Sequence, residues 1–343
     1  MTQSVKGSEG GPPQRADIDF TLRPRLLVPV IVLMGLAAWL SWWLFMRPFP
    51  VDSNIPHYVK QPNVTGSLIS AGSDTLTDVM VVCSRGFRRL YPSVTIQLED
   101  KGSGTAPPAL IEGRSQIAPM SRVMTDEEAH AFEAKYGYPP TAYKIALDAL
   151  AVYVNRDNPI RQMTLQQLDG MFSSTRRKGA AAIDSWGSLG LTGDWTSKNV
   201  ELFGRDANSG THDYFRQHVL DGGEFRPTVH EDLSQDVVQD VADHVNGVGY
   251  SGIGWRTSNV RTVALGNTAK EFFEPTYEDA LTGRYPLARF LYIYVNQPPG
   301  QPLQGAVGEF IKYVLSYEGQ QAVVEAKFFP LPAKVVAETS SRH

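Results

Sequence analysis

The sequence contains a single cysteine, Cys83, in 343 residues, which excludes an intrachain disulfide and a cysteine-rich metal site. It also lacks an excess of basic charge, since 32 lysines and arginines stand against 36 acidic residues and give a formal net charge of -4. We therefore expect no nucleic-acid binding through a general positive field. The seven histidines show no H-E-x-x-H or comparable spacing, so no metal or other cofactor is expected. A hydrophobic content of 42% excludes a wholly disordered chain.

One long run without charge is present near the N-terminus, from Leu26 to Met46. About 20 apolar residues span the hydrocarbon core of a bilayer, so this run predicts a transmembrane helix. The run is longer than the apolar region of a signal peptide, roughly 7–15 residues, and no small-x-small cleavage motif follows it. The opening segment is rich in glycine, proline, serine and charge, which predicts a flexible tail at residues 1–25, and basic residues are more numerous before the run than after it, which places this tail in the cytoplasm. We expect residues 47–63 to form a linker, and the chain beyond them to lie in the periplasm or extracellular space.

Beyond about Val64 the sequence alternates short β-like runs with stretches of helical spacing. Apolar residues recur at helical intervals from Leu76 to Leu90, for example, between two β-like runs. This alternation predicts an α/β fold with a largely parallel sheet. Two distant segments, 150–155 and 290–296, resemble each other because both are β-rich and end in Val-Asn. We interpret them either as two strands that cross side by side between lobes or as two ordinary core strands.

Three turns of similar composition carry the chemistry, at residues 72–76, 102–105 and 205–211. Each turn follows a predicted strand, contains glycine, serine and threonine, and precedes a predicted helix. Helix N-termini expose unpaired N–H groups and the positive end of the helix dipole, and small residues let an anion approach them. Arg205 would add a full charge and directed donors. Taken singly each turn is an ordinary helix cap, but together they predict a cage for a compact tetrahedral oxyanion.

With these motifs the chain resembles the substrate-binding proteins of phosphate-specific ABC transporters, a branch of the periplasmic binding proteins. The resemblance extends from Gly66 to about Lys334 and includes further motifs at 117–122, 148–152, 248–250 and 315–320. It implies a two-lobed α/β fold of type II, the Venus-flytrap arrangement, in which the lobes close on the ligand like a hinged clamp. We expect residues 64–150 and 291–343 to form lobe one, and residues 151–290 to form lobe two.

The resemblance also implies a ligand site that is shared by the two lobes. The first two turns would supply backbone and hydroxyl donors from lobe one, and the third turn would grip the ligand from lobe two. The expected ligand-binding residues are Ser73, Thr75, Leu76, Ser103, Gly104, Ser121, Arg122, Asp148, Arg205, Ser209, Gly210 and Thr211.

One position departs from the family pattern. The best-known members place an aspartate where this chain has Arg122, and that aspartate accepts the proton of hydrogen phosphate and rejects fully ionised sulfate. Arginine accepts no hydrogen bond, so selectivity against sulfate requires another acceptor. Asp148, Asp74 and Asp206 are the candidates; we favour Asp148, which sits where a strand enters the hinge, although an ordinary strand-end role stays open for it. Arg122 either contacts the anion, which we favour, or pairs with a neighbouring acid.

These observations predict a membrane-tethered, monomeric, extracytoplasmic protein that captures inorganic phosphate or a similar oxyanion and delivers it to an ABC permease. The alternative is a membrane-anchored sensor or scaffold that signals occupancy to a partner without transport, and the uncleaved anchor motivates it. A third hypothesis is a hydrolase that uses Ser209 and His212. It is disfavoured because no serine lies in a G-x-S-x-G elbow and the second turn lacks the lysine of a P-loop. We therefore expect no enzymatic activity.

Overall fold

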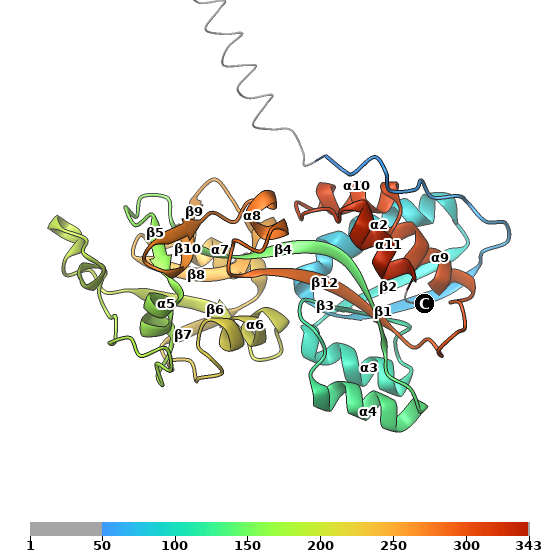
Figure 1. Ribbon diagram of the computed structural model, residues 1–343, viewed down its shortest axis with the longest axis horizontal. Coiled ribbons are helices and arrows are strands. Elements are labelled where there is room, and N and C mark those ends of the chain that lie inside the picture. Colours follow the sequence, from blue (N-terminus) through green and yellow to red (C-terminus); the bar gives the residue numbers. More distant parts are fainter. Residues whose placement is uncertain (1–49, 342–343) are drawn as a thin grey trace, which may run out of the picture. The chain divides into compact units, whose positions relative to one another are not determined.

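The computed structural model describes residues 50–341 (Figure 1). The predicted transmembrane run at 26–46 and the tail before it lie outside the described residues. Among residues 50–341, no helix is both long enough and apolar enough to cross a bilayer.

A mixed sheet of nine strands forms the centre of the described fold. In spatial order its strands are β2 (Val94–Asp100), β1 (Gly66–Gly72), β3 (Ile117–Met120), β12 (Ala288–Val295), β4 (Thr141–Asn155), β8 (Gly247–Gly252), β6 (Glu201–Arg205) and β7 (Val229–Asp232), with β9 (Val260–Thr262) beside β4. Strand β1 is parallel to β2 and β3, and β6 is parallel to β7 and β8. Every pairing that involves β4 or β12 is antiparallel. The prediction of parallel strands is therefore confirmed at the two ends of the sheet and wrong in its middle.

Helices cover this sheet, and a small second sheet lies beside it. The helices are α2 (Thr77–Leu90), α3 (Ala106–Glu112), α4 (Asp126–Tyr136), α5 (Leu165–Phe172), α6 (Gly210–His218), α7 (Ser234–Asp243), α8 (Tyr277–Leu281), α9 (Gly305–Val314), α10 (Tyr317–Glu325) and α11 (Ala333–Ser341). The second sheet contains β11 (Glu271–Phe273), β10 (Ala264–Thr268) and β5 (Gln162–Thr164). The helical spacing predicted for 76–90 is confirmed, because Val79, Cys83 and Phe87 form the buried stripe of α2.

The two largest hydrophobic cores of the described residues mark two lobes. The core of lobe one joins residues from both ends of the sequence, such as Leu68 and Phe87 with Phe310 and Leu331. The core of lobe two is built mainly from the middle of the sequence, around Trp186 and its neighbours. Strands β4 and β12 run from one lobe to the other (Figure 1). They are the structural candidates for the hinge.

The two crossing strands differ in one respect from the sequence-based interpretation. They do lie side by side, in a register that runs from Ala288 opposite Ala149 to Val295 opposite Thr141. The matched segment 150–155, however, pairs with β8 and β9 and not with β12. The reason is the length of β4, which has 15 residues. Its first part pairs with β12 at the crossing, and its second part belongs to the sheet of lobe two.

The described part of the predicted linker packs against lobe one. Ile55 is 1% exposed and belongs to the core of this lobe. The Tyr58 hydroxyl donates to Glu309 Oε2 at 2.6 Å, and the Tyr58 N–H donates to Glu318 Oε2 at 2.8 Å. This segment, which we call the strap (residues 50–63), is therefore part of the folded lobe although it contains no helix or strand.

Candidate functional site

The first predicted turn follows β1 and leads into α2 through the short helix η1 (Asp74–Leu76). Gly72 is required here, because a Cβ atom at this position would lie 2.1 Å from the Pro119 carbonyl oxygen. The Ser73 N–H donates to that same oxygen at 2.9 Å. Ser73, Thr75 and Leu76 are buried, and the Ser73 Oγ has no hydrogen-bond partner. The turn thus holds a hydroxyl group and a helix start away from solvent.

The second turn follows β2 and forms the short helix η2 (Ser103–Thr105) before α3. Ser103 is fully buried, and its Oγ accepts a hydrogen bond from the Ser121 N–H at 3.0 Å. The Gly104 N–H donates to the Asn208 carbonyl of lobe two at 3.0 Å. The second turn of lobe one therefore contacts the third turn directly.

The third turn connects β6 to α6. The Ser209 Oγ caps this helix by accepting from the Thr211 N–H at 3.1 Å. The next residue, Gly210, packs so closely on the second turn that a Cβ atom would lie 2.4 Å from Ser103 Oγ. The Thr211 Oγ1 lies 3.0 Å from Thr75 Oγ1 of the first turn. All three turns, and the N-termini of the helices they precede, meet at one buried place between the lobes.

Arg205 lies at the end of β6 and is fully buried. A buried guanidinium requires a charged partner, which here comes from the other lobe. Its Nη2 lies 2.7 Å from Asp74 Oδ2, its Nη1 donates to Ser234 Oγ, and its Nε donates to the Asp232 carbonyl at 2.8 Å. The predicted cation is thus beside the three turns and forms an ion pair between the lobes.

Arg122 follows β3 and pairs with two acids. Its Nε donates to Asp213 Oδ2 of lobe two at 2.8 Å, and its Nη1 and Nη2 donate to the Glu128 carboxylate at 2.7 and 2.8 Å. Burial opposes the charge of Asp213, but hydrogen bonds and charges from His212 and Arg122 lower the pKa of this carboxyl overall. These contacts fit the pairing alternative, and direct contact of Arg122 with an anion stays a prediction.

Asp148 lies on β4 opposite Arg289 of β12, with both its oxygens engaged. Its Oδ1 accepts from the Ile253 N–H at 3.2 Å, and its Oδ2 accepts from Arg289 Nε at 3.0 Å. The Arg289 Nη2 also donates to Thr211 Oγ1 at 2.8 Å. Asp148 therefore belongs to a hinge ion pair that reaches the site through Arg289, and Arg289 Nη1 is buried without a partner.

The structure gathers most of the predicted site residues. Ten of them meet where the turns converge, namely Ser73, Thr75, Leu76, Ser103, Gly104, Ser121, Arg205, Ser209, Gly210 and Thr211, whereas Arg122 and Asp148 form ion pairs at its border. Sequence reasoning missed Arg289 and Ser234. A single arginine beside the apolar run 290–295 was a usable signal for Arg289, but Ser234 reads as an ordinary helix start.

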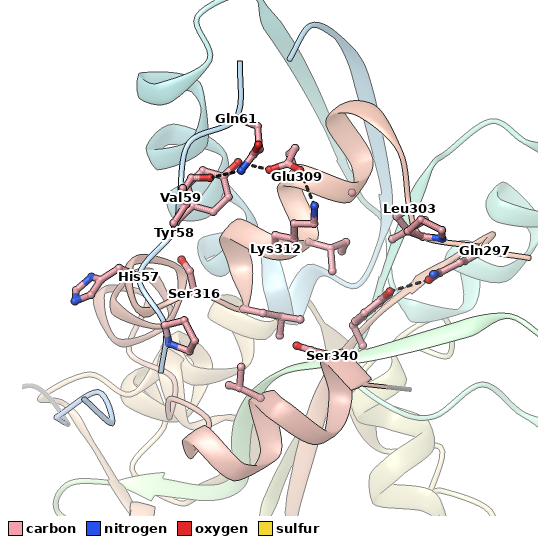
Figure 2. A pocket seen from close by; sticks show the side chains of 17 residues that line it. His57, Tyr58, Val59, Gln61, Gln297, Leu303, Glu309, Lys312, Ser316 and Ser340 are labelled. Carbon is pink, nitrogen blue, oxygen red and sulfur yellow. Dashed lines mark hydrogen bonds and ion pairs between the residues drawn. The ribbon is translucent and has the colours of Figure 1, made fainter. Parts of the chain in front are cut away.

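A separate cavity of about 430 Å³ lies in lobe one, between the strap and α9. Figure 2 shows Tyr58, Glu309 and Lys312 on its wall, where Lys312 Nζ pairs with Glu309 Oε1 at 2.8 Å. None of the three turns lines it. It is therefore distinct from the site between the lobes.

Comparisons with known proteins agree with this arrangement. Residues 59–318 match the family model of the PBP superfamily domain. The phosphate-binding protein PstS of Pseudomonas aeruginosa is 51% identical over 288 residues, which cover 83% of this chain and 89% of that protein.

Two solved structures are similar in fold. One is a candidate phosphate ABC transporter substrate-binding protein of Clostridium perfringens with bound phosphate, with a TM-score of 0.65, 24% identity and coverage of 78% of this chain and 100% of that one. The other is an ABC-type phosphate transport receptor of Vibrio cholerae, with a TM-score of 0.61, 22% identity and coverage of 77% and 100%.

Proposed function

This chain belongs to the PstS family of phosphate-binding proteins within the PBP superfamily, and from this premise we propose that it binds inorganic phosphate outside the cytoplasm and delivers it to an ABC permease. It is a binding protein and not an enzyme, so the hydrolase hypothesis for Ser209 and His212 is wrong. The sensor alternative draws no support from the relatives, which are named as phosphate-binding or phosphate transport proteins.

The observation that carries the proposal is the meeting of three hydroxyl-bearing turns beside a buried arginine. Thr75 and Thr211 come within 3.0 Å of each other although they are 136 positions apart in the sequence. Backbone N–H groups at the start of a helix bind anions because they point at the ligand and lie at the positive end of the helix dipole. Hydroxyl donors and the Arg205 guanidinium add directed hydrogen bonds, and burial strengthens each of these interactions. A small dehydrated tetrahedral anion is the ligand that this donor set suits.

We further propose how the protein is placed and divided. The run at 26–46 acts as a single membrane anchor with the N-terminus in the cytoplasm, and a monomeric binding part lies outside. The boundaries between the lobes fall in the crossing strands, near residues 150 and 290. The charge-free length of 26–46 supports the anchor, and the two separate hydrophobic cores support the division.

Titration calorimetry of the full-length chain with phosphate tests the binding function. We expect the wild type to bind phosphate and Arg205→Gln to lose most of the affinity, by a factor of about 10–100, since a hydrogen bond to a charged group contributes about 1.5–3 kcal/mol. Arg88→Gln is the matched control, because Arg88 is exposed on α2. Unchanged binding by Arg205→Gln would show that the site is elsewhere.

A further inference from the structure

A groove in lobe one lies apart from the anion site and plays no part in the proposed function. It has a volume of about 440 Å³ and lies between helix α2 and strand β2. Its lining includes Val81, Arg85, Arg88 and Arg89 of the helix and Ile96 and Leu98 of the strand. We call it the edge groove, because β2 is the end strand of the nine-stranded sheet.

Strand β2 has one free edge. Among the described residues it pairs only with β1, so the backbone N–H and C=O groups of its other edge have no partner strand. It is seven residues long, whereas β7, the end strand on the other side of the sheet, has four. An extended segment of another protein binds to such an edge by adding a strand to the sheet. Strand β2 is long enough to hold a segment of this kind.

The edge groove is apolar at one end and basic at the other. Helix α2 connects the parallel strands β1 and β2, so it runs antiparallel to both. Its second turn, with Val81, therefore lies toward Leu98, and its last turn, with Arg88 and Arg89, lies toward the start of β2. A ligand of this groove must match both ends.

The basic end carries charge that the protein does not neutralise itself. Arg85 pairs with Glu325 of α10, but Arg88 and Arg89 are exposed and form no ion pair with any of residues 50–341. This local excess of positive charge occurs in a chain whose formal net charge is -4. At the apolar end, Val81 is 43% exposed. Charge complementarity thus favours a ligand with carboxylates at one end and an apolar side chain at the other.

We propose that the edge groove binds an extended acidic segment of a partner protein, which joins the sheet as a further strand beside β2. The backbone of the segment pairs with the free edge of β2, and its carboxylates pair with Arg88 and Arg89. An apolar side chain at the other end of the segment packs against Val81 and Leu98. Because the side chains of a strand alternate between two faces, the three recognised side chains occupy every second position of the segment.

Two simpler roles for these arginines require only their charge. Basic side chains beside an edge strand discourage unwanted pairing between proteins. The dipole of a helix also favours them in its last turn, where Arg88 and Arg89 lie. Neither role requires a groove, nor an exposed valine opposite partly buried strand residues. The test must therefore separate attraction by charge from strand pairing.

The test is fluorescence anisotropy of a labelled peptide that is titrated with the full-length chain. The peptide has seven residues, as β2 has, with glutamate, glutamate and valine at every second position and threonine elsewhere. The reversed peptide is tested in parallel, since strands pair in either direction. We expect one of the two peptides to bind, and the amide hydrogens of residues 94–100 to exchange more slowly in its presence. N-methylation of two consecutive central residues of this peptide, which keeps every side chain but removes a donor on each edge, should weaken binding at least about tenfold.

A charge reversal tests the basic end. Arg88→Glu combined with Arg89→Glu should lower the affinity for the acidic peptide by at least about tenfold, because two attractions become two repulsions. Arg176→Glu combined with Arg177→Glu is the matched control, since these neighbouring arginines lie in lobe two and also form no ion pair with residues 50–341. Both double variants should keep the phosphate affinity of the wild type.

Three results would refute the proposal. Binding of neither peptide by the wild type would leave the arginines as guards of an edge strand. Equal binding of the N-methylated peptide would show attraction by charge without strand pairing. Self-association of the wild type that the charge reversal abolishes would identify a second copy of this chain as the occupant. If the charge-reversed chain does not fold, the peptides still decide on the wild type. Phosphate calorimetry of the same preparation tests the proposed function separately, because none of the three turns of the anion site lines the edge groove.

Discussion

Gly210 is a residue at which the absence of a side chain lets the lobes meet. It begins α6 in lobe two and faces the second turn of lobe one. A Cβ atom there would lie 2.4 Å from Ser103 Oγ and 2.7 Å from Ser121 Oγ, distances that real Cβ contacts do not show. Alanine suits a helix start as well as glycine does, so the constraint comes from the facing lobe alone.

We therefore predict that Gly210→Ala weakens phosphate binding and leaves the unfolding transition nearly unchanged. Overpacking costs about 1–3 kcal/mol, which corresponds to a loss of affinity of about fivefold to more than a hundredfold. Calorimetry and thermal unfolding of the same preparation measure the two effects. Gly104→Ala is the matched control, since its Cβ would lie 3.4 Å from the nearest atom, the Asn208 carbonyl oxygen. Equal losses in both variants would contradict this explanation.

The residues that sequence reasoning identified are those whose role depends on near neighbours. Ser209 caps α6 through a residue two positions on, and the three turns are readable as strand, small residues and helix. Arg289 could not be assigned in this way, because its partner Asp148 lies 141 positions away and the pairing depends on the register of β4 against β12. Asp213, which pairs with Arg122 from the other lobe, could not be assigned either, because it lies 91 positions away.

At the scale of elements, the strands themselves were easier to predict than the neighbouring strands with which they pair. A β-rich run such as 150–155 is recognisable from its composition. Its neighbours in the sheet are not, because period-two patterns carry no information on which strand lies alongside. The long β4 shows this, since its first part pairs with β12 and its second with β8 and β9.

Asp213 of helix α6 and Arg122, which follows strand β3, join the two lobes, and this link should depend on pH. The pKa of Asp213 is lowered in the folded protein, so the link stabilises the fold above the ordinary aspartate pKa. It is lost as the pH falls below about 4 and through the lowered value. We predict that Asp213→Asn lowers the melting temperature by about 1–3 °C at neutral pH, a small effect because the pair is partly solvated.

Melting curves from neutral to acid pH check this prediction. The difference between wild type and Asp213→Asn should shrink and vanish as the pH falls through the pKa of Asp213. Glu224→Gln is a suitable comparison, because Glu224 forms an exposed pair with Arg216 within lobe two. A constant difference at all pH values would mean that Asp213 stabilises the fold by packing and not by charge.

At the scale of the whole molecule, the proposed anchor gives a direct prediction. The full-length chain should stay with the membrane fraction through an alkaline carbonate wash, because about 20 buried apolar residues hold a helix in the bilayer. Mass spectrometry of the retained protein should show the N-terminal residues still attached. A shorter protein in the soluble fraction would show that 26–46 is removed during export.

The two-lobed arrangement itself came from the resemblance to a family and not from composition. Alternating strands and helices predict an α/β fold, but they do not say that residues near both ends share one core. That information lies in contacts such as those of Phe87 with Phe310, whose rings are 5.4 Å apart between centroids. Family motifs supplied what local patterns could not.

This joining of the two ends has a consequence for how the protein is made. The core around Trp186 is built from residues 147–287 together with Phe329, so a growing chain can bury most of this core as soon as the middle of the sequence is available. Lobe one cannot be completed then, because α9, α10 and Leu331 belong to its core and are synthesised last. Strands β1, β2 and β3 must wait with apolar faces uncovered, and chaperones would be needed most during that interval.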